Sequence, residues 1–189
     1  MKVFSYPHKA RDRWLNTPVG SAAYKPWLTD GGSLTRRLQL RCQHFSVRPV
    51  RVQEARPHLS EARLLRCLSR RKAWLRDVHL QCEGRVVVFA HSVLPHAAMQ
   101  GAWRGLVTLG NRSLGSTLFS DPTIRRIPLQ YKKLGPHHFL YRRAAAGLDG
   151  LPRVLWARRS VFTLKCSAIL VTEIFLPAVL QLTLQQGDT

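Results

Sequence analysis

Apolar and polar residues alternate with a period of two over 73–82 and, after a slip, over 43–54, the pattern of β-strands with one covered face. Four further stretches are also expected to be strands: 85–94, 123–131 with an interruption at Pro128, 155–164 and 169–177. The dipeptide Glu83-Gly84 has the length and composition of a hairpin turn between 73–82 and 85–94. Pro49 has no backbone N–H for a sheet ladder, which predicts that 43–54 is an edge strand. The pattern predicts an antiparallel sheet of about six strands.

Apolar residues recur at helical spacing between these strands. Helices are expected over 33–40, with Ser33 as the N-cap, over 57–69 and over 97–109. Strands joined in hairpins, with helices packed on the resulting sheet, predict an α+β fold.

The length of 189 residues is typical of one domain. Residues 1–25, with two prolines and a glycine, predict a poorly ordered or loosely attached N-terminal extension. Residues 26–189 are expected to form a single domain. Within it the basic segment 132–152 carries no assignable role.

One cation lies with the apolar residues of a predicted strand. Over 73–82 one face carries Trp74, Arg76, Val78, Leu80 and Cys82, and the other carries Leu75, Asp77, His79 and Gln81. Arg76 therefore points toward the core, while Asp77 is expected to face water. A buried guanidinium presents a planar fork of donors that suits a carboxylate.

One acid lies in an equally apolar setting. Glu173 is the only ionisable residue between Cys166 and Gly187. A buried carboxylate needs a partner or loses its charge, and buried carboxylates are often functional groups. Two interpretations stay open. In the first, Arg76 and Glu173 line a closed pocket for a small anion. In the second, Glu173 belongs to a buried Arg–Glu pair that only stabilises the fold, and Arg76 is one candidate for its partner.

The net charge of +20 raises the question of nucleic-acid binding. The basic residues, however, are spread along the whole chain in pairs, without a finger, an aromatic box or a basic tail. Charge of this kind informs about association and solubility. We expect no specific nucleic-acid partner, and weak contact with an anionic membrane surface is a further interpretation.

The four cysteines, Cys42, Cys67, Cys82 and Cys166, are far apart and form no CxxC motif. Their spacing argues against a zinc site and fits reduced thiols in a cytoplasmic protein. His91 is expected to be a hydrogen-bonded core or rim histidine, because no Ser/Asp pairing lies near it in sequence. No secretory signal and no uninterrupted apolar span of transmembrane length is visible.

Seven segments, in this order, resemble the chorismate pyruvate-lyase family. They are Gly32-Ser-Leu-Thr-Arg-Arg-Leu, Trp74-Leu-Arg-Asp, Ala90-His-Ser-Val-Leu-Pro95, Leu109-Gly-Asn-Arg-Ser-Leu-Gly115, Leu118-Phe119, Leu155-Trp-Ala-Arg-Arg-Ser160 and Thr172-Glu-Ile-Phe-Leu-Pro177. The resemblance covers roughly residues 26–180. It implies a small single-domain lyase with a buried site and no metal or organic cofactor, which converts chorismate to 4-hydroxybenzoate and pyruvate at the start of ubiquinone biosynthesis. The protein is also expected to be a monomer.

The resemblance also implies roles for individual residues. The grip on the ring carboxylate falls on Arg76, completed by backbone amides beside Leu34 and Leu114. The acid at the ring hydroxyl end falls on Glu173. Leu34 is Met in some relatives, which matters little if it contributes main chain and packing. A second arginine is needed for the pyruvyl carboxylate, and either Arg126 or Arg158 could supply it.

A non-catalytic module that binds aromatic acids is the alternative interpretation. A similar fold is used as the effector domain of some transcription regulators. Such a regulator would also need a DNA-reading helix-turn-helix, for which this chain has room only in residues 1–25.

Overall fold

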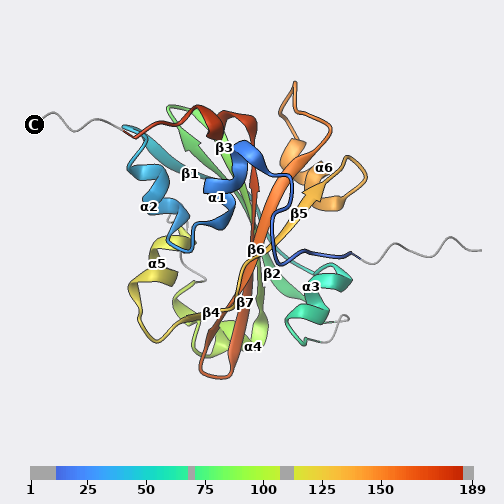
Figure 1. Cartoon of the computed structure of the whole chain (residues 1–189). Helices are drawn as coiled ribbons and strands as arrows, with labels where there is room; N and C mark the ends of the chain where they lie inside the picture. The colour runs from blue at the N-terminus through green and yellow to red at the C-terminus, as the bar shows by residue number, and fades with distance from the viewer. Residues whose placement is uncertain (1–11, 68–70, 107–112, 185–189) are drawn as a thin grey trace, which may run out of the picture.

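The computed structural model describes residues 12–67, 71–106 and 113–184. Within them the chain forms one antiparallel sheet, ordered β1-β2-β3-β7-β6-β4, with β5 also paired to β6 (Figure 1). The strands are β1 Phe45–Ala55, β2 Ala73–Cys82, β3 Arg85–Pro95, β4 Arg125–Arg126, β5 Gln130–Leu134, β6 Leu155–Leu164 and β7 Ser167–Phe175. The α+β antiparallel prediction is confirmed, with seven strands in the described part. The extra strand arises because the chain around Pro128 separates β4 from β5.

The hairpins form where the turn residues allow them. Glu83 and Gly84 both have positive φ, 49° and 74°, the backbone that a two-residue turn between twisted strands requires. β1 lies at the sheet edge, as Pro49 predicts, and its pairing with β2 is irregular between Pro49 and Arg51. The long strands β2, β3, β7 and β6 are adjacent, so their side chains form the centre of both sheet faces.

Helices cover both faces of the sheet. They are η1 Ala22–Tyr24, α1 Lys25–Thr29, α2 Leu34–Gln39, α3 Leu59–Leu64, α4 His96–Gln100, η2 Arg104–Leu106, α5 Leu114–Ser120, α6 Phe139–Ala145 and η3 Pro177–Gln181. In Figure 1, α1, α2 and α5 lie on one side of the sheet, and α3 and α6 on the other. We call these the front face and the back face. No helix of the described residues is long and apolar enough to cross a membrane.

Two regions differ from the sequence-based expectation. The helix expected over 97–109 ends at Gly101, whose ψ of −126° lies outside the helical range, and only a short η2 follows; residues 107–109 lie outside the described ranges. The basic segment 132–152, left without assigned structure, contains α6, begun by His138, whose side chain accepts a hydrogen bond from the Leu140 N–H.

The described part of the N-terminal extension packs on the domain. Trp14 is buried in the apolar cluster of the back face, and Leu15 forms an isolated bridge to Tyr131. The Lys132 ammonium lies 2.5 Å from the Asp12 carboxylate. Residues 12–25 are therefore attached to the domain by core, backbone and ionic contacts, while the division of the chain at residue 25 stays a prediction.

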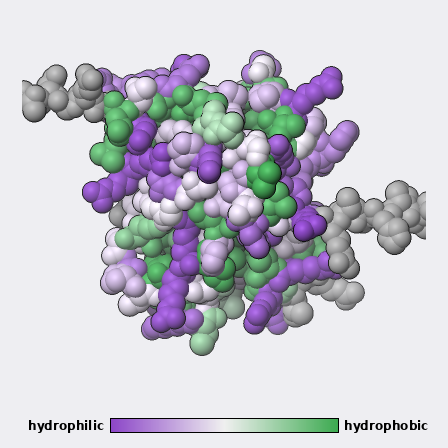
Figure 2. Space-filling view, viewed as in Figure 1, coloured by the Kyte–Doolittle hydropathy of each residue, from purple (hydrophilic) through white to green (hydrophobic). Residues whose placement is uncertain are grey.

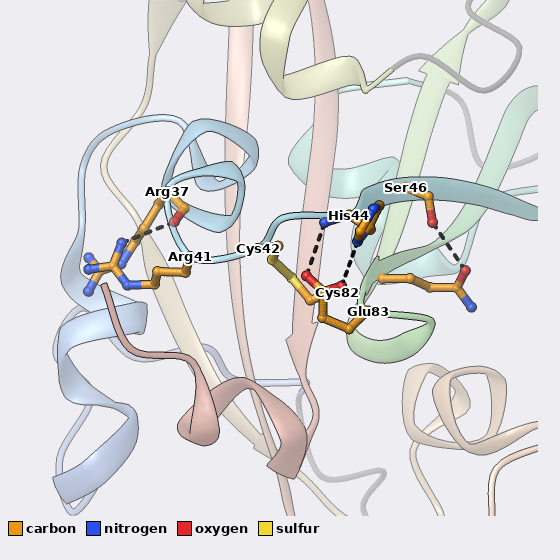
Figure 3. Close-up of a disulfide and its surroundings, with 8 residues drawn as sticks. Arg37, Arg41, Cys42, His44, Ser46, Cys82 and Glu83 are labelled. Carbon is orange, nitrogen blue, oxygen red and sulfur yellow. Dashed lines mark hydrogen bonds and ion pairs between the residues drawn. A yellow bond between two sulfur atoms is a disulfide. The ribbon is translucent and has the colours of Figure 1, made fainter. Parts of the chain in front are cut away.

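The expectation of four reduced thiols is wrong for one pair. Cys42 and Cys82 form a disulfide, with Cα atoms 5.4 Å apart, and both side chains are buried (Figure 3). Sequence spacing did not show this pairing because the antiparallel sheet brings together residues that lie 40 positions apart. The bond links the segment after α2 to the end of β2, and the His44–Glu83 contacts lie beside it. Cys67 and Cys166 are unbonded, and the cytoplasmic location stays a prediction.

Hydrophilic side chains cover much of the surface in the view of Figure 2, in several groups separated by apolar patches. On this face they do not gather into one continuous stripe. The dispersal agrees with the scattered basic pairs of the sequence.

Candidate active site

A pocket opens on the front face between two apolar clusters. Above it lies a cluster that joins α1, α2 and η3 to the sheet, and below it lies one that joins α4, η2 and α5 to the sheet. Its lining comes from the front-facing residues of the strands and from the first turns of α2 and α5. The lining residues are Leu34, Thr35, Val47, Arg76, Val78, Leu80, Ala90, Ser92, Ser113, Leu114, Gly115, Leu118, Phe119, Arg126, Phe162, Val171 and Glu173.

All four residues that the sequence proposes for the site line this pocket. Arg76 and Glu173 come from the sheet, and Leu34 and Leu114 are the first residues of α2 and α5, which pack on it. Arg76 lies opposite Ser92 on β3, and Ser92 lies opposite Val171 on β7, two positions before Glu173. The two charged residues are therefore two strands apart, roughly 10 Å across the sheet. Both side chains line the same pocket, so one small ligand can contact both of them.

Arg76 is 7% exposed, and burial lowers its pKa. An arginine starts from so high a pKa that it stays protonated at neutral pH. Its positive charge lies in the lining of a largely apolar pocket, where the low dielectric strengthens its attraction for an anion.

Glu173 is held by a different arginine. Arg158 Nε donates a hydrogen bond to Glu173 Oε2 over 2.5 Å, and the two residues are directly paired across β6 and β7. Arg158 itself is fully buried and donates through Nη1 to the carbonyls of Trp27 and Asp30 at 2.8 Å and 2.7 Å. The buried Arg–Glu pair weighed from the sequence therefore exists. It coexists with a place for Glu173 on the pocket wall.

Arg126 is the second cation of the lining. It comes from β4, where it lies opposite Phe162, and its Nη1 donates to the Gly31 carbonyl over 2.9 Å. Its guanidinium lies over the rings of Phe119 and Phe162, 5.5 Å and 5.3 Å from their centroids. Burial and the neighbouring Arg158 lower the pKa of Arg126, while the Glu173 charge opposes this effect.

The two helices that cover the pocket are joined at their starts. The Thr35 and Ser113 hydroxyls are hydrogen-bonded to each other. Gly115 is required there, because a Cβ on it would lie 2.8 Å from Thr35 Oγ1. The first N–H groups of a helix have no intrahelical acceptor. The starts of α2 and α5 therefore bring backbone donors, those near Leu34 and Leu114, to the side of the pocket.

A second charged cluster lies on the back face. His91 Nδ1 lies 2.5 Å from Asp77 Oδ1, and its Nε2 lies 3.1 Å from Glu61 Oε1, an ion-pair distance without hydrogen-bond geometry. Arg143 Nη1 lies 3.6 Å from the other Asp77 oxygen. Burial alone would lower the pKa of His91, but the hydrogen bond to Asp77 and the negative charges of Glu61 and Asp77 outweigh it and raise the pKa to about 9.

This cluster corrects two sequence-based expectations. Asp77 does not face water; it is 3% exposed, because α6 covers the face to which it points. His91 is a buried, paired histidine as expected, but an aspartate does lie beside it, since antiparallel pairing places Asp77 directly opposite.

Sequence reasoning alone missed several pocket residues. Thr35 and Ser113 directly flank Leu34 and Leu114, so their position was the available signal. Gly115, a glycine in the first turn of a helix, signals close approach of another chain segment. The Arg158–Glu173 pairing had no sequence signal, because it depends on which strand lies next to β7.

Known proteins resemble this chain over nearly its whole length. The sequence model of the family described as "Chorismate lyase" matches residues 13–183. A probable chorismate pyruvate-lyase of Methylobacillus flagellatus is 55% identical over 92% of this chain and 98% of its own length. One from Nitrosomonas europaea is 49% identical over 89% of this chain and 96% of its own length.

Solved structures share the fold at low identity. PhnF from Mycobacterium smegmatis has a TM-score of 0.59 and 16% identity over 85% of this chain and 70% of its own. The effector domain of PhnF has a TM-score of 0.57 and 14% identity over 78% and 90%. This likeness concerns the fold alone. The family match and the curated relatives lead to the conclusion that this chain belongs to the chorismate lyase family.

Proposed function

We propose that this chain is a lyase that eliminates pyruvate from chorismate and releases 4-hydroxybenzoate. The observation that carries the proposal is that a member of the chorismate lyase family holds Arg76 and Glu173 in the lining of one pocket. The apolar lining between them suits the faces of the substrate ring.

The substrate has one orientation that satisfies both charged residues. Arg76 would hold the ring carboxylate through two parallel hydrogen bonds, with backbone amides beside Leu34 and Leu114 as further donors. The C4 hydroxyl would then reach Glu173, whose carboxylate Arg158 keeps in place. This orientation places the enolpyruvyl ether at C3 near the same end as Glu173.

The reaction requires mainly that the enzyme holds the substrate in its reacting conformation. The C3–O bond breaks, the C4 hydrogen leaves as a proton, and the electrons of its C–H bond complete the aromatic ring. The enolate released gains a proton on its methylene carbon and becomes pyruvate. Aromatisation supplies the driving force, so the enzyme holds the reacting conformation and stabilises charge on the departing oxygen.

Two routes can carry the proton. In a cyclic transfer, the C4 hydrogen moves directly to the methylene carbon of the departing group, since both lie on the same face of the ring. In the other route Glu173 takes it as a base. Chorismate with deuterium at C4 separates them: retention of the label in the pyruvate methyl group favours direct transfer, and its loss to solvent favours Glu173.

The first experiment follows pyruvate and 4-hydroxybenzoate together after purified protein is added to chorismate. Equal, enzyme-dependent formation of both supports the proposal. Binding of 4-hydroxybenzoate without turnover would instead favour an effector-type module. Absence of both binding and turnover would contradict the lyase and the effector-type module alike. Supply of 4-hydroxybenzoate to ubiquinone biosynthesis, action as a monomer, and weak contact with an anionic membrane surface are finer parts of the proposal; flotation with acidic liposomes tests the last.

A further inference from the structure

We infer that Arg126 binds the second carboxylate of the substrate, the one on its enolpyruvyl group, and so distinguishes substrate from product. The inference rests on the proposed function and assigns a binding residue to the same pocket. It starts from the charge balance around the pocket.

The pocket has more positive than negative charge. Among the described residues that line it, Arg76 and Arg126 are cationic and Glu173 is anionic. Arg158, behind the wall, adds a third cation that is paired to Glu173. The net charge of these four described residues is +2, which favours a dicarboxylate over a monocarboxylate. A monocarboxylate held at the Arg76 end would leave the partly buried Arg126 without an ion-pair partner among the described residues, which is costly in a low-dielectric site.

The unsatisfied donor of Arg126 indicates where the second carboxylate binds. Its Nη1 is engaged by the Gly31 carbonyl, but its Nε is buried and has no hydrogen-bond partner among the described residues. No carboxylate in the described part of the chain forms an ion pair with it either. A buried donor without an acceptor is expensive, and buried polar groups in folded proteins are nearly always paired. A ligand carboxylate at this end of the pocket would satisfy it.

Arg126 is also held in place before a ligand arrives. Its guanidinium packs over Phe119 and Phe162, both of which line the pocket with it. Aromatic faces and the Gly31 carbonyl together limit its rotamers, so little side-chain entropy is lost when a carboxylate binds.

Arg158, the other candidate, is less suited to this role. It is fully buried and does not line the pocket. Its Nε is occupied by Glu173 and its Nη1 by backbone carbonyls. Although its Nη2 has no partner among the described residues, a ligand would have to displace Glu173 or the wall to reach it. Arg158 therefore positions Glu173, and Arg126 is left to bind the ligand.

The test compares substrate with product. Arg126→Gln should raise KM for chorismate roughly 10- to 100-fold, the range for loss of a charge-assisted hydrogen bond. The Kd for 4-hydroxybenzoate, measured by calorimetry, should change little, because this product has only the ring carboxylate. The ratio of KM to Kd is the decisive number, since a purely structural role for Arg126 would weaken both ligands together.

Matched variants complete the design. Arg125→Gln removes the exposed neighbouring arginine of β4 and should leave the ratio unchanged. Arg126→Lys keeps the charge but loses the planar fork, so it should raise the ratio less than Arg126→Gln. It also serves as the deciding variant if Arg126→Gln does not fold. Arg76→Ala should weaken the binding of both chorismate and 4-hydroxybenzoate, because both ligands carry the ring carboxylate that Arg76 is proposed to bind.

An unchanged ratio in folded Arg126→Gln, or equal weakening of both ligands, would overturn the inference. Failure of the proposed function looks different. If the wild-type protein binds chorismate without converting it, the lyase proposal fails, and the Kd for chorismate replaces KM in the same comparison. If the wild-type protein does not bind chorismate at all, both the proposed function and the role of Arg126 are wrong.

Discussion

The two faces of the sheet treat buried charge in opposite ways. On the back face, Glu61, Asp77, His91 and Arg143 form a cluster in which acids and bases balance. On the front face, Arg76 and Arg126 line the same pocket as Glu173, which is paired to Arg158, and a donor of Arg126 has no acceptor in the described part of the chain. Strand β2 contributes to both faces, with Arg76 facing the front and Asp77 facing the back.

The difference separates structural charge from functional charge. A buried cluster whose positive and negative charges balance contributes to the stability of the fold and needs no bound ion. A buried cluster with excess charge and an unsatisfied donor is incomplete until an anion binds. Substitutions on the front face should therefore affect turnover and binding more than stability, and substitutions on the back face should do the reverse.

The largest effect is expected from Glu173→Gln. The amide can still accept the hydrogen bond of Arg158, so the fold and 4-hydroxybenzoate binding should persist, with a moderate loss of stability. Turnover should fall roughly 10²- to 10⁴-fold, the usual contribution of a general acid or base. Steady-state kinetics and thermal unfolding check this, and near-wild-type turnover would remove Glu173 from the chemistry.

The corresponding break on the back face is Asp77→Ala. It leaves His91 and Arg143 without their shared carboxylate, and breaking a buried pair costs about 3–5 kcal/mol. The free energy of unfolding in urea should fall by that order, while turnover per folded molecule stays near that of the wild type. The control is Asp149→Ala, an exposed acid. Loss of turnover without loss of stability would show that the back cluster is functional.

The pH dependence of stability sharpens the same comparison. Because the pKa of His91 is raised from 6.5 to about 9, its contribution is complete below pH 6.5 and is lost as the pH rises through 9. The shift corresponds to something on the order of 3 kcal/mol. Urea unfolding between pH 6.5 and 9.5 should show this decline in the wild type. In His91→Gln, which does not titrate there, the decline should be absent.

The smallest effect is expected from Leu34→Met on the front face. Leu34 lines the pocket with an apolar side chain, and a swap that conserves volume usually costs less than about 1.5 kcal/mol. The kcat/KM for chorismate should change little. A large loss would show that the Leu34 side chain, and not only the backbone at the start of α2, positions the ring.

Much of this architecture could be predicted from local pattern. Alternation located β2, apolar runs located β3, β6 and β7, Glu83-Gly84 the hairpin, Pro49 the edge and Ser33 the helix cap. Each of these signals depends on residues close in sequence. Arg76 and Glu173 stood out because charge is rare in an apolar stretch. Asp77 was misjudged because alternation shows that two faces differ but not that either one is exposed, and helices cover both here.

The sequence by itself therefore determined most of the strands, the fold class and the two charged residues Arg76 and Glu173 that line the pocket. Only the tertiary structure decided how charged groups and thiols are paired. Arg158 pairs with Glu173 and Asp77 with His91, and Cys42 forms a disulfide with Cys82. The physical reason is that secondary structure follows from short-range periodicity and turn geometry. The partner of a buried charge or thiol depends instead on strand order and register, which bring distant residues within a few ångströms of each other.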